Sequence, residues 1–181
     1  MHSIKKYYNL GKEKLYPICR SITGEGTYKT LKIIKNKFRG LKIKSISSQS
    51  KIFDWRVPSE WNISEAYVID KFGKKIIDFK RNNLHLMSYS KPVDKYFNKK
   101  EFFNHIYYLK KLPDAIPYAT SYYKKRWGFC ISYNDKKIFD RTYNKNDKFR
   151  VVIKSFFKKK GYLRYGELIL KGKSNQEILI S

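Results

Sequence analysis

Residues 112–132, LPDAIPYATSYYKKRWGFCIS, constrain the fold of this chain more than any other segment. Two prolines, Pro113 and Pro117, interrupt the first part of the segment, and aromatic and basic residues alternate through the rest. The aromatic residues are Tyr118, Tyr122, Tyr123, Trp127 and Phe129, and the basic ones are Lys124, Lys125 and Arg126. Such interleaving is typical of a half-buried strand, whose alternate side chains face solvent. It also suits a binding surface, so the rest of the chain has to decide between the two.

A nucleic-acid or other polyanion ligand is the first binding hypothesis for this segment, because aromatic side chains stack on bases and basic ones hold phosphates. The chain has 41 Lys and Arg against 15 Asp and Glu, and its net charge of +26 would attract any polyanion. However, lysine is spread over the whole length, and no helix-turn-helix, zinc-finger or RNA-binding strand signature is present. We therefore favour a core role for the aromatic residues and keep a polyanion-binding module as the alternative.

Length and composition indicate a folded, cytoplasmic protein. A chain of 181 residues suffices for one domain, or for a small domain plus part of another. Apolar residues make up 41% and aromatic residues 17%, which argues against disorder. Cys19 and Cys130 show no disulfide framework, and we expect two reduced thiols. We see no signal-peptide pattern and no run long enough to cross a bilayer, so no membrane partner is expected.

Hydrophobic periodicity predicts helices early in the chain and strands later. We expect one or two helices over residues 3–18, and a helix over 27–38 that Thr27 caps and Gly40 stops. The strand predictions cover residues 41–47, short strands within 53–80, and 128–133. Between them we expect a helix over 99–109, and turns over 134–147. At the end, we predict a hairpin of residues 149–157 and 162–170, and a buried strand over 177–181.

No catalytic or metal-binding constellation emerges from the residues themselves. His85 and Cys130 could form a base and a nucleophile, but nothing near either completes such a site. The histidines and cysteines lack the paired spacing of zinc ligands, and we expect His85 and His105 to be structural.

Residues 20–26 form a glycine-containing loop with two open interpretations. Arg20 and backbone N–H groups at the start of the second helix could hold an anion. Alternatively, the loop connects two helices and needs Gly24 and Gly26 for its backbone geometry.

Several motifs carry a resemblance to a known family. Arg20, Gly24 and Gly26, the following helix and strand, and the runs Leu170-Lys171-Gly172 and Ile178-Leu179-Ile180 resemble the beginning of the two-zinc aminopeptidases. Three longer motifs are FDWRVPSEWNI, NNLHLMSYSKPVD and LPDAIPYATSYYKKRWGFC. They resemble a small domain of unknown function that is inserted in one bacterial subgroup of aminopeptidase-like proteins. The resemblance covers nearly the whole chain.

The resemblance implies an α/β fold in two parts. Residues 1–54 and 148–181 would form an incomplete zinc-exopeptidase-type α/β layer, with N-terminal helices, a strand, and a C-terminal hairpin and strand. Residues 55–147 would form a mostly β insertion. An unpaired sheet edge in the incomplete layer would favour aggregation of the isolated chain.

The resemblance also implies a function that this chain does not complete. The family hydrolyses peptides with two zinc ions. The resemblance implies that the zinc ligands and the general base would lie beyond Ser181. We therefore expect no catalytic residue, metal ligand or cofactor in this chain, and no activity of the chain alone. Zinc is expected in full-length members, and peptide or amino-acyl substrates are the expected partners. Nucleic acid is not expected, and a homo-oligomer stays open. The candidate substrate-binding residues are Arg20, Gly24, Gly26, Tyr122, Arg126 and Trp127.

Overall fold

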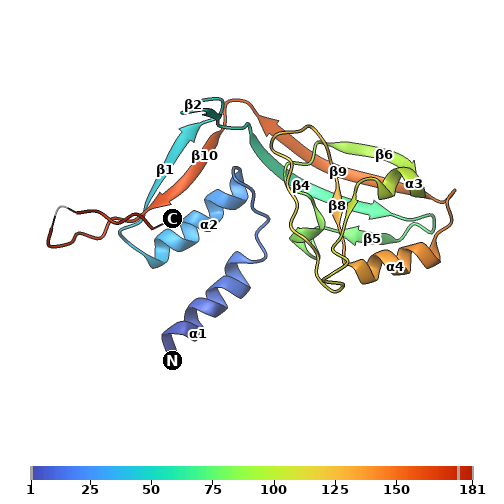
Figure 1. The fold of residues 1–181 in the computed structure, drawn as a ribbon, viewed down its shortest axis with the longest axis horizontal. Coiled ribbons are helices and arrows are strands. Elements are labelled where there is room, and N and C mark those ends of the chain that lie inside the picture. Colours follow the sequence, from blue (N-terminus) through green and yellow to red (C-terminus); the bar gives the residue numbers. More distant parts are fainter. Residues whose placement is uncertain (1, 175, 181) are drawn as a thin grey trace.

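The structure is a computed structural model that describes residues 2–174 and 176–180. It is a mixed α/β fold with open sheets, divided into two lobes that meet at a junction (Figure 1). The helical lobe contains α1 (His2–Asn9), the π-helix η1 (Leu10–Leu15), α2 (Glu25–Lys37), β1 (Lys42–Ser47) and β10 (Tyr162–Glu167). The junction carries a small hairpin of β2 (Lys51–Ile52) and β3 (Trp55–Arg56). The sheet lobe contains β4 (Glu60–Ile69), β5 (Lys75–Asp78), the 3-10 helix η2 (Asn83–His85), β6 (Val93–Asn98), α3 (Lys99–Phe103), β7 (Ile106–Tyr107), β8 (Phe129–Cys130), α4 (Tyr133–Thr142) and β9 (Lys148–Lys158).

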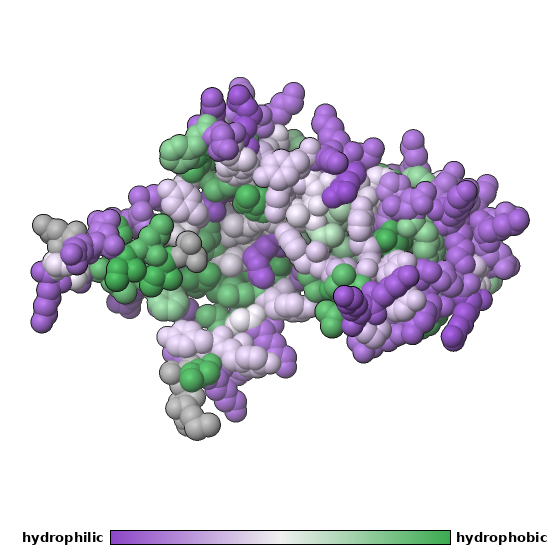
Figure 2. Space-filling view, in the orientation of Figure 1, coloured by the Kyte–Doolittle hydropathy of each residue, from purple (hydrophilic) through white to green (hydrophobic). Residues whose placement is uncertain are grey.

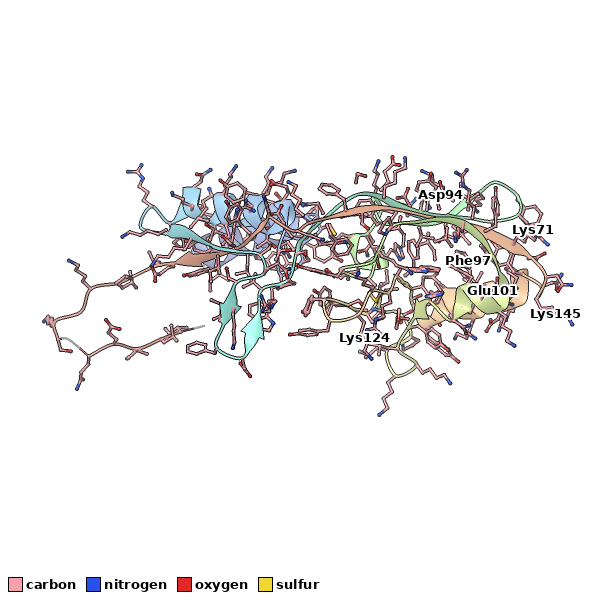
Figure 3. The ribbon with its side chains drawn as sticks, turned by 90° about the horizontal axis from the view of Figure 1, so that it is seen from above. Lys71, Asp94, Phe97, Glu101, Lys124 and Lys145 are labelled. Carbon is pink, nitrogen blue, oxygen red and sulfur yellow. The ribbon has the colours of Figure 1, made fainter. Side chains whose placement is uncertain are left out.

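In the helical lobe, α2 covers one face of the antiparallel pair β1–β10 (Figure 3). A Cβ atom added to Gly166 of β10 would lie 3.2 Å from the Leu31 side chain of α2. The Arg164 guanidinium, two residues away and on the same face, lies 4.5 Å from the centre of the Tyr28 ring. In the described part of the chain, no helix covers the opposite face of this two-stranded sheet (Figure 3). The predicted helices at the start of the chain and the strand over residues 41–47 are confirmed.

The sheet lobe is built on four antiparallel strands in the order β5-β4-β9-β6. One face of this sheet packs against α3, α4 and the segment around β8 (Figure 3). Branched side chains of the strands and aromatic side chains of the covering segments form one buried core, which includes Val68, Ile77, Val151, Ile153, Phe102, Phe129 and Phe139. The predicted strands within residues 53–80 are confirmed.

The predicted hairpin of residues 149–157 and 162–170 is wrong. β9 pairs with β4 and β6, whereas β10 pairs with β1, because the chain runs on through the turn at 159–161 instead of folding back. The ladder between β1 and β10 therefore continues into the ladder between β4 and β9, and the Ser48 N–H donates to the Gly161 carbonyl (2.9 Å) where the two meet. The expected division at residue 147 consequently separates β9 from the sheet that it forms.

The helix predicted over residues 99–109 is also wrong in its second half. Asn98 and Glu101 form a capping box that starts α3, which ends at Phe103. Ile106 and Tyr107 then leave the helix and pair in parallel with Phe129 and Cys130. Tertiary pairing thus outweighs the helical periodicity of this segment.

Two further corrections concern residues 128–147. The strand expected over 128–133 is limited to β8, and the expected turns contain the helix α4. Ser132 caps this helix, since its side chain accepts a hydrogen bond from the Asp135 N–H (3.0 Å). The sequence pattern Ser132-x-x-Asp135 could have revealed the helix.

At the two ends of the helical lobe, the structure differs from expectation in detail. α2 begins at Glu25 and not at Thr27. The Asn62 side chain, which belongs to β4, accepts a hydrogen bond from the Glu25 N–H (2.9 Å) and so caps the helix from a distant part of the chain. Residues 177–180 are not a strand, and the side chains of Ile178, Leu179 and Ile180 are about 90% exposed. Ser181, the last residue of the expected strand, lies outside the described residues.

Glu60 occupies the junction, at the first position of β4, and is only 2% exposed. Its carboxylate accepts hydrogen bonds from the Tyr162 N–H (3.0 Å) and the Asn62 side chain (3.1 Å). It also forms ion pairs with Arg164 (3.4 Å) and Lys158 (3.7 Å). Burial acts to raise the pKa of Glu60, but these hydrogen bonds and charges outweigh it and lower the pKa below its ordinary 4.5.

We predict that Glu60→Gln lowers the free energy of unfolding by about 2 kcal/mol at pH 7, because a charged acceptor of several hydrogen bonds is lost. A carboxyl whose pKa is lowered by folding stabilises the native state above its unfolded pKa, and loses that effect as the pH falls through the folded pKa. Urea unfolding should therefore show the stabilities of wild type and variant converging as the pH falls through the lowered folded pKa of Glu60. A difference that is constant from pH 7 to pH 3 would contradict the prediction.

We predict that Gly161→Ala destabilises the chain by about 1–3 kcal/mol, because overpacking forces neighbouring atoms to move. The new Cβ would lie 2.2 Å from the Cβ of Glu60, whereas a Cβ at Gly11 would meet nothing within 4 Å. Gly11→Ala, in the π-helix, is therefore the matched control and should be neutral or stabilising in the same urea titration. Equal effects of the two substitutions would argue against the close packing at the junction.

Candidate functional site

The candidate site lies at the junction, where residues 20–26 meet the start of β4. The Thr23 hydroxyl accepts a hydrogen bond from the Trp61 N–H (3.0 Å) and donates to the Tyr89 hydroxyl (2.6 Å). Tyr89 in turn donates to the Ser59 carbonyl (3.1 Å). Thr23 and Tyr89 are both almost fully buried, so this chain of hydrogen bonds fixes the loop to the sheet lobe.

The two loop glycines serve close backbone packing. Gly24 has φ of +96°, and a Cβ there would lie 2.2 Å from the Trp61 carbonyl oxygen. A Cβ at Gly26 would lie 1.9 Å from the Cys19 carbonyl oxygen. The exposed Arg20 side chain donates to the Leu15 carbonyl. These contacts favour the interpretation of the loop as a connection rather than an anion site, because its glycines are needed for packing and Asn62 occupies the first N–H of α2.

Tyr89 links the loop to the aromatic segment that opened the sequence analysis. Its ring contacts Trp61, Tyr122 and Phe157, with ring centres 5.8, 5.3 and 6.0 Å away. Its φ is +64°, a strained value for an aromatic residue, and such strain gathers at functional positions. Burial raises the pKa of Tyr89 to about 12, so its hydroxyl stays neutral at physiological pH.

The structure places the six candidate substrate-binding residues in different surroundings. Gly24 follows Thr23 in the loop and Tyr122 contacts Tyr89, so these two lie near the Thr23–Tyr89 pair. The Arg126 guanidinium folds back onto Ser121 (2.9 Å) and the Thr120 carbonyl (3.3 Å). Trp127 is only 4% exposed.

Trp127 belongs to the core of the sheet lobe. Its ring stacks on His105 (3.7 Å between ring centres) and contacts Phe97 (5.1 Å). The polyanion alternative required aromatic residues of this segment to stack on bases, and the buried Trp127 ring is not accessible for such stacking. The exposed aromatic residues of the segment are Tyr118 and Tyr123.

Four side chains that could act as nucleophiles or metal ligands, those of His85, His105, Cys19 and Cys130, have structural surroundings. The Nδ1 atoms of His85 and His105 lie 2.8 and 3.2 Å from the carbonyl oxygens of Cys130 and Trp127. Burial raises the pKa of the thiols of Cys19 and Cys130 to about 11 and about 12, and a protonated thiol is a poor nucleophile. Over residues 2–174 and 176–180, no group of three or more His, Cys, Asp or Glu is placed to hold a metal ion. The described residues therefore do not fit a zinc site.

The sequence did not indicate the two residues on which the junction depends most, Glu60 and Tyr89. Both lie in motifs singled out above, but a glutamate at a strand start is ordinarily exposed, and nothing local marks a tyrosine for a left-handed backbone. Chemically, the junction offers aromatic rings and neutral hydroxyl groups, which suit binding and positioning. In the described part of the chain, no helix is long and apolar enough to span a membrane.

We predict that Tyr89→Phe lowers the free energy of unfolding by about 1–2 kcal/mol, because the substitution removes the hydroxyl that joins Thr23 to Ser59. Tyr123→Phe is the matched control: Tyr123 is 79% exposed, and its loss of a hydroxyl should be neutral. Chemical denaturation of both variants measures the effect. Equal stabilities would show that the buried hydroxyl does not hold the loop to the sheet.

Comparisons with known proteins place the chain in a family. Residues 60–156 match the family described as "Domain of unknown function (DUF2172)". A Clostridium acetobutylicum protein described as a "putative polysaccharide biosynthesis protein with aminopeptidase-like domain" is 47% identical over 174 residues, which are 96% of this chain and 38% of that protein. A crystal structure of a "putative peptidase" from Clostridium acetobutylicum is 43% identical, with a TM-score of 0.77 over 91% of this chain and 40% of that one. This chain spans about two fifths of the length of either relative, and it belongs to the DUF2172 family.

Proposed function

We propose that this chain is the amino-terminal, non-catalytic part of a zinc-dependent aminopeptidase-like protein. The observation that carries the proposal is the match of nearly the whole chain to about two fifths of a relative described as having an aminopeptidase-like domain. A second relative, similar in fold, is described as a peptidase. In this proposal, the metal ligands and the general base come from residues outside these 181.

The helical lobe would belong to the catalytic domain of the longer protein. Its two-stranded sheet has α2 on one face, and among the described residues no helix covers the other face (Figure 3). The segment that follows β10 carries exposed apolar side chains, which form a green cluster at the chain end in Figure 2: Leu168, Ile169, Leu170, Ile178, Leu179 and Ile180. Exposed apolar patches of this kind mark interaction surfaces. This arrangement supports the incomplete α/β layer implied by the sequence resemblance.

The sheet lobe would be the domain inserted into the aminopeptidase-like protein, and its role would be to position the substrate. Residues 55–147 were expected to form it, and the strand pairing adds β9. The Tyr122 ring contacts the buried Tyr89 ring (5.3 Å between ring centres), so neutral hydroxyl and aromatic groups would face a substrate held between the lobes. Peptide or amino-acyl groups are the substrates that the proposal expects.

We predict that the purified 181-residue chain binds no stoichiometric zinc and does not release p-nitroaniline from leucine-p-nitroanilide above the rate of the blank. The reason is that the described residues form no metal site, and metal-assisted hydrolysis needs bound ions to generate the attacking hydroxide. Elemental analysis and an absorbance assay with added zinc make the two measurements.

The positive control is the Clostridium acetobutylicum protein described as a "putative peptidase", assayed in parallel with and without a chelator. One zinc per chain in the 181-residue protein, with turnover that a chelator abolishes, would overturn the proposal.

A further inference from the structure

The junction hairpin, residues 51–56, holds one aromatic side chain out into solvent. β2 and β3 pair Lys51 with Arg56 and Ile52 with Trp55, which leaves Phe53 and Asp54 as the two turn residues. The Phe53 side chain is 91% exposed. Two-residue hairpin turns usually place glycine or asparagine where φ is positive, yet Phe53 has φ of +52°. The backbone of Phe53 is therefore strained, although its side chain packs against almost nothing within the described structure.

The strained conformation is braced by the base of the hairpin. The Gln49 N–H donates to the Val57 carbonyl (2.8 Å), and the Val57 N–H donates to the Ser50 carbonyl (3.0 Å). The Arg56 guanidinium donates to the Gln49 carbonyl (2.7 Å), and the Val57 side chain is fully buried. A rigid hairpin with an exposed aromatic tip is a pre-organised binding element, since little conformational freedom is lost when it docks.

Charge indicates the kind of surface that would receive the tip. Lys51 and Arg56 form the cross-strand pair beside Ile52 and Trp55, and the segment with Lys159 and Lys160 adjoins the hairpin, since the Ser48 N–H donates to the Gly161 carbonyl. These four basic residues outnumber the single acidic residue of the turn, Asp54. Figure 2 shows hydrophilic side chains around an apolar group in this region, near the label β2 of Figure 1. With a net charge of +26, a second copy of the chain would be repelled, whereas an apolar pocket with an acidic rim would be complementary.

The part of the longer protein outside this chain can supply such a pocket. The chain matches only 38% and 40% of its two relatives, so more than half of a protein of that length lies elsewhere. Figure 3 shows the hairpin projecting on the side of β1–β10 that α2 leaves bare. A neighbour that covers the bare face would therefore also reach the hairpin.

We infer that Phe53 anchors the junction in an apolar, acid-rimmed pocket on that remaining part. The inference rests on the function proposed above. Buried aromatic anchors of this kind carry much of the binding energy of an interface. The strain at Phe53 is then retained because it aims the ring at the pocket.

The inference predicts opposite effects of one substitution in two proteins. In the 181-residue chain, Phe53→Gly should raise Tm by about 2 °C, because glycine adopts a positive φ without strain and loses no contact. In the Clostridium acetobutylicum protein of known structure, glycine at the superposed position should lower Tm, because the anchor is lost. Phe72→Gly is the control in this chain: Phe72 is 73% exposed but has no positive φ, so no rise in Tm is expected.

The crystal structure of that relative provides the second readout. The residue superposed on Phe53 should be buried against residues outside the matched 40%. An open, solvent-exposed side chain there, or a rise in Tm with glycine in both proteins, would overturn the inference. Zinc binding and turnover by the 181-residue chain would instead refute the proposed function, and neither measurement involves Phe53.

Discussion

The buried carboxylate of Glu60 is the interaction on which the two-lobed structure depends. It begins β4, accepts the N–H that begins β10, and pairs with Arg164, whose guanidinium also covers the Tyr28 ring of α2. A buried charge is tolerated only with such complete pairing. One side chain therefore fixes the start of the sheet lobe and the return strand of the helical lobe, and Gly161 is small because it packs directly against it.

The polar contacts around Thr23 and Tyr89 add a second connection across the same junction. They hold the loop before α2 to the start of β4, so the lobes are joined both by continuous strands and by side chains from three separate segments. Because these groups are buried and hydrogen-bonded, separating the lobes would leave several polar atoms unpaired. The candidate site thus lies on a rigid surface, and any substrate or neighbour would meet preformed geometry.

Local patterns predicted those elements whose partners are local. The helix over residues 27–38 and the strand over 41–47 follow from spacing alone. The predictions failed where residues far away in the sequence determine the local structure. Ile106 pairs with β8 instead of extending α3, and β10 pairs with β1, more than a hundred positions away. The burial of Trp127 followed from the core interpretation of its segment, but the left-handed backbone of Tyr89 has no local signal because it is imposed by tertiary contacts.

The pairing of β1 with β10 has a consequence for synthesis of the protein on the ribosome. Lys42 pairs with Glu167, 125 positions later, and translation at about 5–20 residues per second delays that partner by roughly 6–25 s. Throughout this interval the apolar side of α2 has no complete sheet to cover. Of the two lobes, the helical lobe is therefore completed second, although its first helices emerge first.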